Sequence, residues 1–252
     1  LRIANILLQT DTAADSILAL TFTESGAKAM RQRLHRYIGS RAYQVSMFTF
    51  HGFAQRLIHE YPDTFPRLLG GRVASDVDKI ATVTTIIETG HYATLRPMGN
   101  PAYYIKPIIN QIAELKQEYV SPDTFRKIIA TQETTLQEMP KLHDKGAHKG
   151  KVRGEYTKLD KVIKKNLELL EVYRLYEAAL REQKLYDFDD MIIEVVEALT
   201  HNEDFLRSVQ EQYQYVLADE HQDVNGSQNK ILECICSYHD RPNIFVVGDE
   251  KQ

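Results

Sequence analysis

The chain has 252 residues, of which 43% are hydrophobic and 26% charged, and its formal net charge is -4 at pH 7. This composition is typical of a soluble globular protein with one large domain or two smaller ones. The net negative charge disfavours a protein that coats nucleic acid with a wholly basic surface. No apolar run approaches the roughly 20 residues of a membrane span. The chain begins with neither Met nor a signal peptide, so we expect a piece of a longer protein. Cys234 and Cys236 have no second pair, which favours a reducing, cytoplasmic location.

The first part of the chain alternates between helical and strand patterns. Residues 1–8 have the apolar spacing of a mostly buried helix, and Ile17–Phe22 is a short apolar run typical of a strand in a parallel sheet. An amphipathic helix is predicted over Ala27–Ile38. A second strand is predicted over Val45–Phe50, and another helix over Phe53–Ile58. This alternation predicts an α/β domain.

Residues 75–184 show helical patterns and no convincing strand, with helices predicted over residues 77–88, 102–119, 122–130 and 156–183. Lys141–Lys165 contains nine Lys or Arg and three acidic residues, a local balance of +6, so the remainder carries -10. This segment is either a solvated basic loop or a surface that follows phosphates. Its first part, Lys141–Arg153, is predicted to be a mobile loop.

Strand and helix patterns resume near Leu185. A helix opens at Asp187, another covers Glu203–Gln212, and strands are predicted over Tyr215–Ala218 and Ile244–Val247. We therefore predict an α/β domain in two parts, residues 1–74 and 185–252, interrupted by a helical insertion over residues 75–184.

Four predicted strands end in polar side chains: Thr21 with Thr23, Thr49 with His51, Asp219 with Glu220, and Asp249 with Gln252. The carboxyl ends of parallel strands meet at one edge of a sheet, where ligands bind. Asp219 and Glu220 could hold a magnesium ion and orient a water for phosphoryl transfer, and Gln252 could sense the terminal phosphate. The threonines suit nucleic-acid phosphates, and Phe22, Phe50 or His51 could stack on bases. Each residue could equally be an ordinary cap or core residue.

Five segments carry a family resemblance. They are Ile17–Thr23 with its following helix, Thr49–Phe53, Asp187–Asp190 (DFDD), Asp219–Asp223 (DEHQD), and Val246–Asp249 with Gln252. In this order they resemble motifs Ia and Ib, the DFDD element, the Walker B motif and motif III of superfamily 1 DNA helicases of the UvrD/Rep/PcrA type. The resemblance covers nearly the whole chain. It implies a P-loop NTPase (RecA-like) parallel sheet with a large all-helical insertion.

The resemblance also implies roles and ligands. ATP and Mg²⁺ would be the cofactors, with Asp219 on the metal and Glu220 activating water. Gln222 and Gln252 would couple the presence of the terminal phosphate of the nucleotide to the binding of DNA. Single-stranded DNA would be contacted by Phe22, Thr23, Thr49, Phe50 and His51. The parent would be an ATP-dependent 3′-to-5′ helicase acting at single-stranded DNA and duplex junctions, with no membrane partner.

The chain also departs from the family pattern. The phosphate-binding GxGKT loop is absent, as is everything after motif III, so we expect the isolated chain to hydrolyse ATP poorly without the rest of its own protein. Glu24–Gly26 replaces the usual Asn-Lys-Ala, His221 stands where an aromatic residue is usual, and Val224 where Thr is usual. For His221 a packing role is favoured over catalysis. Two alternatives stay open: a non-catalytic DNA-binding or scaffolding module, and the helicase subunit of a helicase–nuclease.

Overall fold

A computed structural model describes residues 2–100, 102–143, 149–238 and 241–249 of the chain. It divides into two compact units. Unit 1 comprises residues 1–71 and 188–252, and unit 2 comprises residues 72–187. Among the described helices, none combines the length and the apolarity that crossing a membrane would require.

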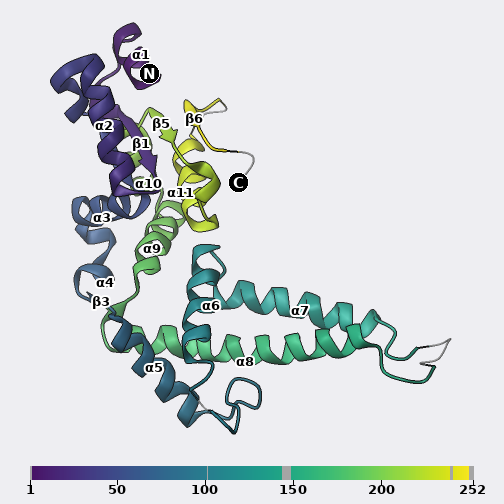
Figure 1. Cartoon of the computed structure of the whole chain (residues 1–252). Helices are drawn as coiled ribbons and strands as arrows, with labels where there is room; N and C mark the ends of the chain where they lie inside the picture. Colours follow the sequence, from purple (N-terminus) through teal and green to yellow (C-terminus); the bar gives the residue numbers. More distant parts are fainter. Residues whose placement is uncertain (1, 101, 144–148, 239–240, 250–252) are drawn as a thin grey trace. The chain divides into compact units, whose positions relative to one another are not determined.

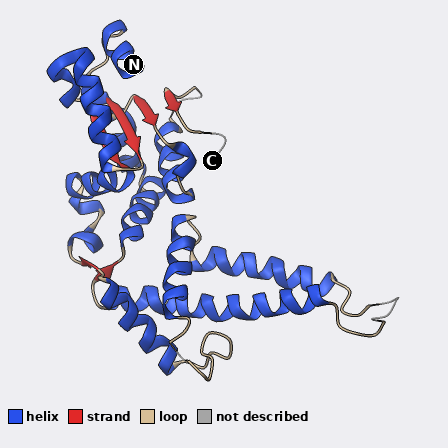
Figure 2. Ribbon diagram, viewed as in Figure 1, coloured by secondary structure: helices blue, strands red, loops and turns tan. Residues whose placement is uncertain are grey.

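Unit 1 is built on a four-stranded parallel sheet in the order β2-β1-β5-β6 (Figures 1 and 2). The strands are β1 (Ile17–Thr21), β2 (Ser46–Thr49), β5 (Tyr215–Ala218) and β6 (Ile244–Val246). All five residues of β1 are buried, as expected for an inner strand with helices on both faces. Because every pairing is parallel, the carboxyl ends of all four strands lie at the same edge of the sheet.

Seven α-helices in the described part of unit 1 flank or follow these strands. The first two pack on one face, where Ile3 and Leu7 share a core cluster with Ile17 of β1 and Leu34. Their bounds, with those of the helices that follow, are α1 (Arg2–Gln9), α2 (Glu24–Ile38), α3 (Phe50–Glu60), α4 (Pro66–Leu69), α9 (Phe188–His201), α10 (Glu203–Gln212) and α11 (Gly226–Cys236). Helix α9 packs against α3, α10 and α11. The predicted α/β architecture is therefore confirmed.

The described part of unit 2 is mostly helical and has one short parallel pair of strands, β3 (Arg72–Val73) with β4 (Leu185–Tyr186) (Figure 2). Its helices are α5 (Asp76–Thr89), α6 (Ile105–Gln117), α7 (Pro122–Glu138) and α8 (Gly154–Glu182). Helices α7 and α8 run side by side as a long hairpin (Figure 1). The core of the unit is apolar and includes Val83, Ile112, Ile129 and Leu170.

Two carboxylates fix the ends and connections of the unit 2 helices. Helix α5 begins with a capping box, in which Ser75 Oγ accepts from the Asp78 N–H and the Asp78 side chain accepts from the Ser75 N–H. Glu168 of α8 accepts hydrogen bonds from the backbone N–H groups of residues 93–95, at 2.8 to 3.0 Å. A single side chain thereby satisfies three donors of the irregular segment after α5.

Three differences between the structure and the sequence-based expectation bear on the site and on the unit bounds. Strand β2 ends at Thr49, and Phe50 is the first residue of α3 rather than the last of the strand. Helix α7 continues from Ala130 to Glu138. Strands β3 and β4 were not predicted; since they pair with each other, they group with unit 2, which is three residues longer at each end than residues 75–184. The predicted mobile loop includes residues 144–148, which lie outside the described residues.

Candidate functional site

Two carboxylates stand at the carboxyl end of β5, an inner strand of the sheet. Asp219 continues the strand, because its N–H donates to the carbonyl of Leu20 at 2.9 Å. Glu220 turns the chain sharply, with φ 54° and ψ 43°, a left-handed conformation that costs a residue with a side chain about 1–2 kcal/mol. Such strain concentrates at functional sites. The turn leaves Asp219 half-buried and the Glu220 side chain exposed.

A cavity of about 580 Å³ lies beside these carboxylates. Asp219 and Glu220 form part of its wall, Ile3 contributes from α1, and one face of α2, which includes Arg33, forms the rest. Carboxylate oxygens are the protein ligands that Mg²⁺ prefers, and a guanidinium can pair with phosphate oxygens. The residues present therefore fit a magnesium-bound phosphate group, to which Asp219 offers a carboxylate. The structure brings Asp219 and Glu220 together as the sequence predicts.

The side chain of Gln222 joins the ends of β5 and β6. Its Nε2 donates to Glu220 Oε2 at 2.7 Å, and its Oε1 accepts from the Asp249 N–H at 3.0 Å. A Cβ added to Gly248 would lie 2.9 Å from Gln222 Oε1, so a side chain at position 248 would push this amide out of its present place. Gln222 therefore holds the Glu220 carboxylate in place and links the residues after β5 to the backbone after β6. Gln252 lies outside the described residues, and its role stays a prediction.

Thr23 and Thr49 both cap helices at the same edge of the sheet. Thr23 Oγ1 accepts from the Gly26 N–H at the start of α2, and Thr49 Oγ1 accepts from the Gly52 N–H at the start of α3, each at 3.0 Å. Thr49 Oγ1 also donates to Glu24 Oε1 at 2.9 Å. The structure thus places both threonines at the expected edge and gives each a structural role there.

The three aromatic candidates differ in their exposure. Phe22 is 50% exposed and can accept a stacking partner. Phe50 is only 2% exposed, so the prediction that it stacks on a base is not supported: as the first residue of α3 it turns into the core. His51 stacks on Phe188, with ring centroids 3.9 Å apart and an interplanar angle of 14°. Burial lowers the pKa of His51, and its Nε2 has no hydrogen-bond partner among the described residues.

Comparison with known proteins decides the family. All 252 residues match the family model described as the UvrD/REP helicase N-terminal domain. The chain belongs to this family. Relatives include a probable DNA helicase of Mycoplasma pneumoniae, 28% identical, and the ATP-dependent DNA helicases PcrA of Bacillus subtilis and Staphylococcus epidermidis, each 24% identical. The matches cover 100% of this chain but 41% of the Mycoplasma protein and 29% of each PcrA, so the chain spans less than half of these relatives.

Membership of the UvrD/REP family confirms the family resemblance and the RecA-like fold. At two positions where the sequence departs from the family pattern, Glu24 and His221, the structure shows what the side chain contacts. His221 lies half-buried, its Nε2 is 3.3 Å from Asn229 Oδ1, and its N–H donates to the carbonyl of Val247. These contacts suit the packing role expected of His221. We find no structural account of Val224.

Sequence reasoning missed two residues of this edge, Glu24 and Phe188. Glu24 is the first residue of α2, and its carboxylate accepts a hydrogen bond from the Thr49 hydroxyl. Phe188 opens α9, is 52% exposed and stacks on His51. An aromatic residue between the aspartates of the DFDD element was the available signal for Phe188. Neither contact is visible in the sequence, because both join segments far apart along the chain.

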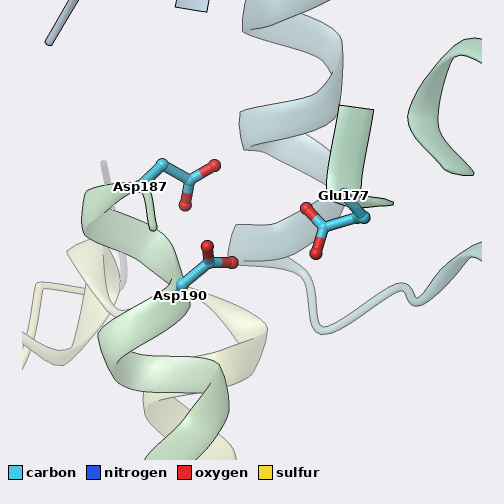
Figure 3. A group of neighbouring side chains, drawn as sticks. All are labelled: Glu177, Asp187 and Asp190. Atoms are coloured by element: carbon cyan, nitrogen blue, oxygen red, sulfur yellow. The ribbon is translucent and has the colours of Figure 1, made fainter. Parts of the chain in front are cut away.

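Three further carboxylates, Glu177, Asp187 and Asp190, are drawn in Figure 3 and could be mistaken for metal ligands. In unit 2 the buried ammonium of Lys116 lies 2.5 Å from Glu177 Oε1 and 2.6 Å from Asp187 Oδ2. In unit 1, Asp190 Oδ2 lies 3.3 Å from the guanidinium of Arg67. Each carboxylate already has a basic partner, so we assign no metal to them.

Proposed function

We propose that the chain supplies part of the ATPase centre and of the single-stranded DNA contact surface of an ATP-dependent helicase that moves 3′-to-5′. One observation carries the proposal: Asp219 and Glu220 stand together at the carboxyl end of β5 and line a cavity large enough for a metal-bound phosphate. The ATP-dependent DNA helicases among its relatives support the same reaction class.

Each residue at this edge has a distinct task in the proposed reaction. Asp219 would hold the magnesium ion, which would neutralise the negative charge of the phosphoryl group that ATP supplies. Glu220 accepts the proton of the attacking water. Gln222 keeps the Glu220 carboxylate in place through its 2.7 Å hydrogen bond, and Gln252 senses the terminal phosphate. Gln222 acts on Glu220 in this proposal, because its amide already donates to that carboxylate.

The DNA contact surface is proposed at the ends of β1 and β2. Phe22 offers an exposed ring for base stacking, Thr23 offers an exposed hydroxyl group to phosphates, and Thr49 offers a part-buried one. His51 is held against Phe188 in its neutral form, which suits a base contact better than a phosphate contact. Single-stranded DNA at a duplex junction is the proposed substrate.

The decisive experiment replaces Glu220 by Gln in the full-length protein that carries this chain. ATP binding should persist, while DNA-stimulated ATP hydrolysis and unwinding should fall roughly 100- to 10,000-fold, because the proton acceptor is lost. Glu211→Gln, an exposed position on α10, removes the same charge and should leave both rates unchanged. Hydrolysis that survives Glu220→Gln would refute the assignment of the base.

Two further measurements test the finer parts of the proposal. Unwinding of partial duplexes with a 3′ or a 5′ single-stranded tail tests the direction, and only the 3′ tail should support it. The 252-residue chain alone should hydrolyse ATP slowly, because no GxxxxGK[ST] sequence for cradling phosphates occurs within it. Rapid DNA-stimulated hydrolysis by this chain would contradict that expectation.

A further inference from the structure

We propose that the Glu24 carboxylate competes with a DNA phosphate for the Thr49 hydroxyl, and so lowers the affinity of the proposed contact edge for single-stranded DNA. The inference rests on the proposed DNA contact surface and adds a determinant of its strength. It makes this chain a weaker DNA binder at this edge than the same fold with an uncharged residue at position 24.

The geometry places one anionic oxygen where a phosphate oxygen would approach. Thr49 Oγ1 lies 2.9 Å from Glu24 Oε1 and also accepts the Gly52 N–H at 3.0 Å. A Cβ added to Gly52 would lie 3.6 Å from Glu24 Oε1, so the carboxylate lies against the first turn of α3. The N-terminal turn of a helix favours an anion, and here the protein's own carboxylate is that anion.

The hydroxyl of Thr49 can serve only one of the two acceptors. A threonine hydroxyl has one proton to donate, and in the structure it goes to Glu24. A phosphate oxygen that takes this proton must displace the carboxylate, and the two negative charges then lie within a few ångströms of each other. Binding therefore loses one hydrogen bond and gains a repulsion.

Within the described chain, the first turns of α2 and α3 contain no Lys or Arg, and the first basic residue of α2 is Lys28, its fifth residue. The first four residues of α2 are Glu24 to Ala27 and those of α3 are Phe50 to Phe53, and neither set contains Lys or Arg. His51 adds no positive charge near neutral pH, because burial lowers its pKa. A phosphate approaching this edge therefore meets the Glu24 charge with no basic residue of these turns beside it.

Glu24→Gln tests the inference with little structural change. The amide keeps the side-chain length and an oxygen that can accept from Thr49, but it carries no charge. Binding of a fluorescent oligo-dT to the full-length protein, followed by anisotropy at low salt, should tighten roughly three- to tenfold. The gain should shrink at about 0.3 M salt, because screening weakens the repulsion. Thermal midpoints of both proteins check that the fold is retained.

Two control variants separate the possible outcomes. Glu211→Gln removes an equal charge on α10, and an equal tightening there would overturn the inference, because the effect would be one of net charge. Phe22→Ala removes an exposed ring from the proposed contact edge and should weaken binding. If Phe22→Ala weakens binding while Glu24→Gln leaves it unchanged, the contact surface stands and the competition is refuted. If neither variant changes binding, the proposed contact surface itself fails.

Discussion

Lys116 holds together the most buried group of charges in unit 2, and its removal gives the sharpest stability prediction. Its side chain is 1% exposed, and its ammonium contacts the carboxylates of Glu177 and Asp187 at 2.5 and 2.6 Å. The ammonium also lies 5.5 Å from the centre of the Tyr176 ring. These contacts join α6, α8 and the end of β4 within one unit. Water cannot readily replace these contacts, because the side chains of Lys116 and Asp187 are almost fully buried.

Lys116→Met keeps most of the volume and removes the charge. Two carboxylates, whose side chains are 17% and 5% exposed, would then lose this cation. Breaking a buried ion pair by removing one partner costs about 3–5 kcal/mol, so a loss of this size is expected at pH 7. Adding Glu177→Gln and Asp187→Asn removes the two negative charges and should recover at least half of the loss.

Hydrogen exchange followed by mass spectrometry suits this test, because two units need not unfold in one step. Protection should fall in peptides of α6 and α8 and persist in those of β1 and β5. Lys164→Met is the matched control: Lys164 pairs with Asp160 on the surface of α8 with its side chain 64% exposed, so the change should stay below about 1 kcal/mol. A Lys116→Met loss no larger than the control would refute the assignment of a stabilising role to the buried charges.

Three further outcomes are expected. Ser75→Ala removes half of the capping box of α5 and should cost about 0.5–2 kcal/mol in denaturant unfolding, whereas an unchanged midpoint would argue against a working cap. Burial lowers the pKa of His51 below its ordinary 6.5, so between the two values the unfolded chain binds more protons and stability should fall as pH drops below about 6.5. His51→Gln should flatten that dependence in thermal midpoints measured from pH 5 to 7.5, and identical slopes would contradict it. Phe245 is 44% exposed on β6, an edge strand of the described sheet, so Phe245→Lys should reduce light scattering by the concentrated 252-residue chain, and equal scattering would count against edge pairing as its cause.

The sequence predicts best where a single segment carries its own signal. Tyr215–Ala218 is an apolar run between polar residues, and Glu203–Gln212 follows the capping residue Asn202, so both elements appear with the predicted bounds. Strands β3 and β4 have two residues each, too few for any periodicity. The last eight residues of α7 are mostly polar, so no apolar stripe marked their helix.

The site was predictable in its placement but not in its contacts. Strand ends place Thr49 and Asp219 at one edge, because parallel pairing fixes that edge. A boundary shift of one residue put Phe50 inside the core, and no local pattern distinguishes the two positions. The contact of Glu24 with Thr49 spans 25 positions in sequence, so it depends on how β1 and β2 align.

The amide of Gln222 has a donor end and an acceptor end, so its orientation distinguishes the end of β5 from the end of β6. Its nitrogen faces an acceptor on Glu220, and its oxygen faces a donor, the N–H of Asp249. Rotating the amide by half a turn would set oxygen against carboxylate and N–H against N–H. An isosteric glutamate could satisfy the N–H but would repel Glu220. Position 222 thus demands a group that is donor at one end and acceptor at the other, and among side chains of this length only glutamine is both.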